Sequence, residues 1–79
     1  MLNKNFKEGE YVYIPSGVVG YIFDDVGGVE KYKFKEPKLL MFLGQKYQSG
    51  FGGEYLCKLF YEGTVYSIHQ ENVYSRGEL

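Results

Sequence analysis

The chain has little cysteine and histidine, no tryptophan, and almost no imbalance of charge. One Cys in 79 residues cannot form an internal disulfide, and with a single His the chain has no zinc-binding set, which favours a reducing compartment. The formal net charge of −1 argues against a broadly basic nucleic-acid binder and against a strongly acidic mimic. No apolar run approaches the roughly 20 residues that span a bilayer, and the N-terminal residues lack the apolar stretch of a secretion signal. We therefore expect a cytoplasmic protein.

Aromatic residues are what the chain has in abundance, with nine Tyr and six Phe making 19% of the sequence. A chain of this length forms one domain with a thin core, because it buries only roughly 60–65% of its unfolded surface. Each buried ring removes about 150–250 Å² from water and so compensates for the small size. We expect a single domain over residues 1–79, with frayed ends at 1–8 and 75–79. The Tyr rings should lie partly in the core and partly on a recognition surface.

Short β-rich runs, separated by eleven Gly and two Pro, make up most of the chain, and no helical period is present. The run at 38–43 is almost continuously apolar, which suits a buried strand or a short helix, and its length and flanks favour a strand. A Gly-rich loop at 48–53 precedes a closing hairpin. The predicted strands before that loop are 10–14, 18–23, 31–35 and 38–43.

The closing hairpin, from Glu54 to His69, has a register that the alternation of side chains predicts. A two-residue loop at Glu62-Gly63 pairs Leu59 with Tyr66 and collects the more apolar face of both strands, whereas a three-residue loop would mix the two faces. The expected inward set is Tyr55, Cys57, Leu59, Tyr61, Tyr66 and Ile68. The expected outward set is Leu56, Lys58, Phe60, Val65, Ser67 and His69. The core predicted for the whole domain is Val12, Ile14, Leu40, Phe42, Leu59, Tyr66, Ile68 and Val73.

The end of the chain completes a recognisable order of elements. Residues 69–72 are too polar for a strand and too short for an α-helix, so we expect one 3₁₀ turn, followed by a last strand at Val73-Tyr74. This order of elements resembles that of the SH3-like barrels. It consists of a strand, a long irregular hairpin loop, three meander strands, a 3₁₀ turn and a short last strand. The resemblance implies an all-β fold, an SH3-like barrel of five to six short antiparallel strands.

The N-terminal part is similar to a KOW motif. Gly9-Glu10-x-Val12-x-Ile14-x-x-Gly17 matches its glycine, acid, apolar pair and second glycine, although Gly20 comes one residue early. The chain also resembles small uncharacterised proteins of tailed phages, which open like Gly-Glu-x-Val-x-Ile-Pro-Ser and end like Tyr-x-Gly-x-x-Tyr-x-Ile…Asn-Val-Tyr. These similarities imply a fold more directly than a function.

Four lysines form the only concentrated charge in the sequence, at Lys31, Lys33, Lys35 and Lys38. They could contact phosphates while Tyr32 and Phe34 stack on bases. Alternatively, the lysines protect an exposed edge strand from aggregation while both rings enter the core. The second interpretation is favoured, and the first stays open.

A group of aromatic side chains could line a groove between a Tyr-rich first hairpin and the loop at 48–53. Its members are Tyr11, Tyr13, Tyr21 and Phe51, and Phe51 is the strongest candidate because a ring among glycines has little core to enter. The corresponding loops of SH3 domains bind Pro-rich peptides, but this chain lacks the Ala-Leu-Tyr-Asp-Tyr motif and the Trp of those domains. An aromatic surface for another partner and plain core packing both remain open.

No set of residues typical of catalysis, cofactor binding or metal binding is found. Asp24 and Asp25 precede two glycines and indicate a turn, since no third ligand follows at EF-hand spacing. His69 has no nearby nucleophile and points outward, and Cys57 lies on the apolar face as a small hydrophobe. The glycines match neither a Walker nor a Rossmann pattern.

We therefore expect a non-enzymatic binding or adaptor module without a cofactor. A protein partner is favoured, binding to the Tyr-rich first hairpin and the loop around Phe51, with no membrane contact and with self-association possible. The alternative is binding to nucleic acid or to the transcription or translation machinery through the KOW-like start and the four lysines.

Overall fold

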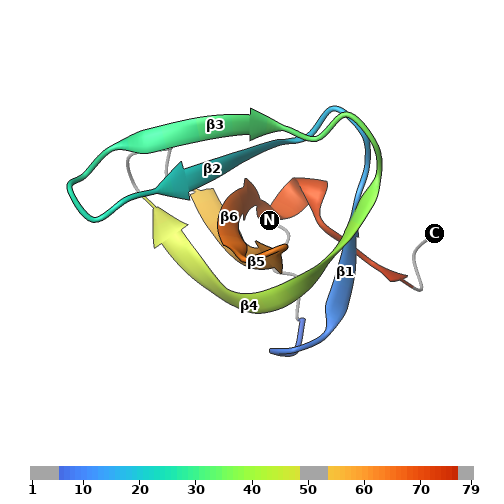
Figure 1. The fold of residues 1–79 in the computed structure, drawn as a ribbon. Helices are drawn as coiled ribbons and strands as arrows, with labels where there is room; N and C mark the ends of the chain where they lie inside the picture. The colour runs from blue at the N-terminus through green and yellow to red at the C-terminus, as the bar shows by residue number, and fades with distance from the viewer. Residues whose placement is uncertain (1–5, 49–53, 77–79) are drawn as a thin grey trace.

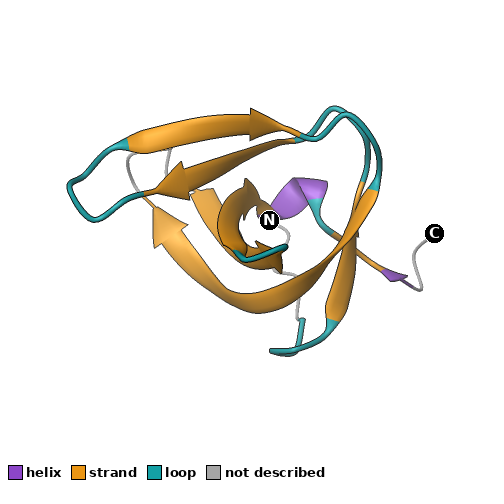
Figure 2. Ribbon diagram, viewed as in Figure 1, coloured by secondary structure: helices purple, strands orange, loops and turns teal. Residues whose placement is uncertain are grey.

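The computed structural model describes residues 6–48 and 54–76, and this part of the chain is all-β (Figures 1 and 2). Seven antiparallel strands form one sheet, and the described residues contain a 3₁₀ turn, η2 (Gln70–Asn72), but no α-helix. No helix in this part of the chain could cross a membrane. The strands are β1 (Tyr11–Ile14), β2 (Val19–Phe23), β3 (Val29–Lys33), β4 (Lys38–Gln48), β5 (Glu54–Tyr61), β6 (Thr64–His69) and β7 (Tyr74–Ser75).

The strand order is β3-β2-β6-β5-β4-β1-β7, so β3 and β7 are the edges and β5 and β6 lie near the centre. Figure 1 shows β4 bending around β5 and β6, while the β2–β3 hairpin extends to one side. The pairing of β4 with β5 shifts between Phe42 and Gly44. An extra residue of this kind bends a strand and increases its twist. The bulge therefore lets one long strand contribute to both ends of the sheet.

The expectation of five to six strands was wrong, because the described residues form seven. The runs predicted at 18–23 and 31–35 correspond to β2 and β3, and they form a regular hairpin where the resemblance implied a long irregular loop. β2 and β3 are paired at five positions, from Val19–Lys33 to Phe23–Val29. The first strand takes no part in this hairpin, since β1 pairs with β4 and β7. The expected Tyr-rich first hairpin therefore keeps Tyr21 but not the tyrosines of β1.

The closing hairpin has the predicted register. Leu59 pairs with Tyr66, and Tyr61 pairs with Thr64 around the two-residue loop. Both loop residues have positive φ, 48° at Glu62 and 82° at Gly63. Two-residue loops of this handedness match the twist of the flanking strands. The predicted 3₁₀ turn is also confirmed, and the last strand begins one residue later than expected.

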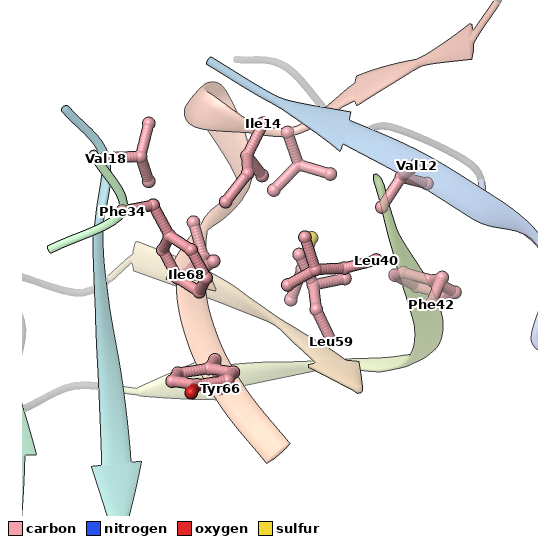
Figure 3. Packing of buried hydrophobic residues seen from close by; sticks show 11 residues of the cluster. Val12, Ile14, Val18, Phe34, Leu40, Phe42, Leu59, Tyr66 and Ile68 are labelled. Carbon is pink, nitrogen blue, oxygen red and sulfur yellow. The ribbon is translucent and has the colours of Figure 1, made fainter. Parts of the chain in front are cut away.

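The core lies on the concave side of the curved sheet, where alternate residues of the strands meet (Figure 3). All eight predicted core residues are buried, and Cys57 is completely enclosed as predicted. Phe34 joins them, with its ring centroid 5.0 Å from that of Tyr66. A Cβ at Gly20 would lie 3.2 Å from the Cβ of Tyr66, so only glycine lets β2 approach this pair without displacement. The buried cluster is Val12, Ile14, Val18, Phe34, Leu40, Phe42, Cys57, Leu59, Tyr66, Ile68 and Val73.

Both ends of the described chain hold more structure than expected. The ring of Phe6 lies 5.3 Å from that of Phe42 and packs against the core. Ser75 belongs to β7 and pairs with Val12. These contacts extend the folded part of the chain into both segments that were expected to be frayed.

Candidate functional site

The convex face of the sheet carries a continuous row of apolar side chains. Tyr11 of β1 pairs with Met41 of β4, Met41 pairs with Phe60 of β5, and Phe60 pairs with Val65 of β6. Residues directly opposite on neighbouring strands point to the same face, with Cβ atoms about 4.5–5.5 Å apart. Leu39 extends this set from the next outward position of β4. We call Tyr11, Leu39, Met41, Phe60 and Val65 the apolar row.

Four of the five side chains of the apolar row are strongly exposed, and Met41 between them is half-buried. Tyr11 is 47% exposed, Phe60 40% and Val65 42%, and Leu39 is similar. A single exposed apolar residue is ordinary, but a contiguous set is typical of an interaction site. Residues beside these in sequence, such as Val12 and Leu59, are fully buried in the core. The row therefore does not belong to the core packing.

The structure separates the tyrosines that were predicted to act together. Tyr11 and Tyr13 both lie on β1, and Tyr13 pairs with Leu39, at the border of the apolar row. Tyr21 lies on β2, and three strands stand between β1 and β2 in the sheet order. Its ring packs edge-on against His69, 6.0 Å away. Phe51, the fourth predicted residue, lies outside the described residues.

Sequence reasoning missed Leu39 and Met41 as parts of this surface, although it assigned Phe60 and Val65 to the outward face of the closing hairpin. The alternation of apolar and polar residues in that hairpin was the sequence signal that placed Phe60 and Val65 on the outward face. The apolar run at 38–43 gave no comparable signal, because residues of both faces are apolar there.

A pocket of about 200 Å³ is the second feature of the convex face. Lys58 pairs with Ser67 and Lys46 pairs with Leu56, which brings these four residues to one face over β4, β5 and β6. Phe23 of β2 joins them from the β2–β3 hairpin. We call it the outer pocket. Its lining residues are Phe23, Lys46, Leu56, Lys58 and Ser67.

The four predicted lysines do not form one stripe. Lys31 and Lys33 are exposed at alternate positions of β3, with Lys31 paired to Tyr21. Lys35 is exposed beyond the end of that strand. Lys38 is half-buried in β4, where its ammonium lies 3.9 Å from the carboxylate of Glu36.

Lys38 also contacts the ring of Tyr61. The Nζ of Lys38 lies 5.7 Å from the centroid of that ring. A hydrogen bond and the charge of Tyr61 raise the pKa of Lys38, and the nearby carboxylates add to this effect. An ammonium with a carboxylate and an aromatic partner contributes less to a phosphate-binding surface than a free one.

Asp24 and Cys57 have structural roles. The carboxylate of Asp24 accepts hydrogen bonds from the N–H groups of Val26, at 3.1 Å, and Gly28, at 2.6 Å, and so caps the predicted turn. Cys57 is enclosed in the core, with Gln45 Nε2 3.8 Å from its Sγ. Among the described residues, no three His, Cys, Asp or Glu side chains gather closely enough to hold a metal ion.

Comparisons with protein-family models, with curated proteins and with solved structures found no match for this chain. The apolar row and the outer pocket are therefore the basis for a functional proposal.

Proposed function

We propose that this chain is a small, non-enzymatic binding module that docks a protein partner on the convex face of its sheet. The apolar row is the observation that carries this proposal, because four strands present their apolar side chains there in register. The order of the strands, with a 3₁₀ turn before the last one, supports an SH3-like barrel as the scaffold.

Two rings of the apolar row are suited to anchor such a partner. Tyr11 and Phe60 flank Met41 across neighbouring strands. Aromatic side chains lose little conformational entropy on binding and bury a large area, so they often dominate the energy of protein interfaces. The flexible thioether of Met41 between them can adapt to the shape of a partner.

Affinity capture from host lysate, before and after nuclease treatment, tests this proposal. We expect at least one protein to be captured by the natural chain after nuclease and to be lost with Phe60→Lys. That substitution places a charge in the centre of the apolar row without touching the core, so its circular dichroism and unfolding midpoint should stay close to those of the natural chain. Lys35→Ala, outside the row, is the matched control and should retain the partner.

Binding to nucleic acid or to the transcription or translation machinery is the second candidate. The observation in its favour is that Lys31 and Lys33 are both exposed on β3, with Tyr21 opposite Lys31. Loss of every captured protein after nuclease, together with loss in a Lys31→Ala/Lys33→Ala variant, would support this candidate and contradict the first.

Self-association is the remaining way to cover the apolar row. Light scattering on the purified chain distinguishes it, because a dimer that dissociates with Phe60→Lys would identify a second copy as the partner. A monomer that nevertheless loses its captured protein with the same substitution supports the proposed partner.

A further inference from the structure

We propose that the outer pocket binds an acidic side chain of the partner protein, with a carboxylate on a short apolar stem. This inference rests on the proposed function and adds the chemistry of a contact next to the apolar row. Three properties of the pocket support it: its positive charge, the hydroxyl of Ser67, and apolar walls of limited size.

The charge of the pocket comes from two lysines on neighbouring strands. Lys58 of β5 and Lys46 of β4 are both exposed, and both line the pocket. No acidic residue is among the described residues that line it. Two ammonium groups at the rim of one pocket favour an anionic group between them.

Ser67 supplies the polar group inside the pocket. The residue is only 7% exposed, although its neighbours across the sheet are the exposed Lys58 and the half-buried Tyr21. Within the described part of the chain, no side-chain hydrogen bond of Ser67 is found. A hydroxyl without an intramolecular partner can donate a hydrogen bond to a group that enters the pocket. An oxygen of a bound carboxylate would accept this hydrogen bond.

The walls and the size of the pocket decide between kinds of anion. Leu56 is 2% exposed yet lies outside the core cluster, and it forms an apolar wall together with Phe23. A volume of about 200 Å³ is below the roughly 300–1,000 Å³ of sites for drug-sized ligands, so it suits one side chain. The phosphates of a nucleic-acid backbone have no apolar stem to contact such walls. An acidic residue with its methylene groups, or an acidic group beside an apolar one, matches both the walls and the charge.

Nuclear magnetic resonance on the ¹⁵N-labelled full chain tests this assignment, with 3-phenylpropionate as the probe and 3-phenylpropanamide as its neutral counterpart. We expect the carboxylate to shift the amide signals of Lys46, Lys58 and Ser67, and the amide to shift them much less at equal concentration. Lys58→Met should weaken binding of the carboxylate about two- to fivefold, the range for one exposed charge pair. Lys35→Met, an exposed lysine outside the pocket, should leave binding unchanged.

Ser67→Ala provides a second readout of the same contact. It should weaken binding of the carboxylate while preserving the dispersion of the spectrum, and if this variant fails to fold, the lysine variants still decide. Equal responses to the carboxylate and the amide, or shifts confined to residues outside the pocket, would overturn the proposal. So would tighter binding of inorganic phosphate than of the carboxylate. A negative result concerns only the pocket, so it leaves the capture experiment with Phe60→Lys independent.

Discussion

At the scale of single residues, Tyr66 connects the core with the edge of the sheet. Its ring packs against Phe34 and lies 5.7 Å from that of Tyr32. Burial raises the pKa of the Tyr66 hydroxyl, and the nearby Tyr32 adds to the effect. The alternation of the closing hairpin predicted Tyr66 in the core, whereas the side taken by Phe34 stayed open. Phe34 is only 1% exposed and joins the core, whereas the expectation that Tyr32 also enters the core was wrong, since Tyr32 is 48% exposed. Phe34 lies beyond the end of β3 at Lys33, so the alternation of that strand does not decide where its ring lies.

Alkaline pH should destabilise the fold through Tyr66. Its pKa is higher in the folded chain than the unfolded value of about 10, so its contribution to stability is complete below that value and is lost as pH rises through the folded pKa. The raised pKa of Lys38 acts in the same direction. Urea unfolding at several values between about pH 8 and pH 11 measures this loss. Tyr66→Phe, which keeps Lys38, should lose less stability over this range. Parallel curves for the two chains would exclude the role of Tyr66.

At the scale of elements, the closing hairpin was predictable because its two strands and loop are contiguous in sequence. Apolar alternation and a Gly in a two-residue loop are enough to choose one register. The strands of the β2–β3 hairpin were predicted, but β3 begins two residues earlier than expected and its pairing with β2 was not assigned. The partners of β1 were not predictable, because β4 and β7 come from distant parts of the chain.

Glu62→Asn should stabilise the closing hairpin. Glu62 has a φ of 48°, in the left-handed region that disfavours residues with a bulky Cβ substituent, and Asn-Gly is the preferred pair in such loops. We expect the free energy of unfolding to rise by about 0.5–1 kcal/mol. Chemical denaturation measures the change, and Glu36→Asn, in the segment before β4, serves as a control that should gain nothing. A loss of stability with Glu62→Asn would contradict this prediction. It would show that a contact of the Glu62 side chain stabilises the fold by more than the backbone strain destabilises it.

At the scale of the whole molecule, the candidate site arises from the pairing of the strands. The sequence assigned Phe60 and Val65 to the outward face, and it chose Tyr11 as a binding residue. Only the pairing of β1 with β4 and of β4 with β5 brings Tyr11 and Phe60 to either side of Met41. The outer pocket depends on tertiary structure in the same way, since Phe23 and Lys46 belong to different hairpins.

Hydrogen exchange should follow the strand order. β5 and β6 have neighbours on both sides, whereas β3 is an edge whose five residues are all exposed. Amides at the open side of an edge strand have no partner and exchange by small local openings, while central amides require larger ones. We expect the amides of Leu59 and Ile68 to exchange at least about tenfold more slowly than those of Lys31 and Lys33. Equal protection of β3 would indicate that another chain pairs with this edge.

The sequence by itself determined the all-β class, the predicted core and the register of the closing hairpin. These features depend on local alternation, on glycines and on turns, so neighbouring residues contain the information. Only the tertiary structure decided which strands neighbour β1, and therefore that Tyr11 lies in one row with Phe60 while Tyr21 lies elsewhere. Pairing between distant strands is chosen by the packing of the whole core, and no short stretch of sequence encodes that choice.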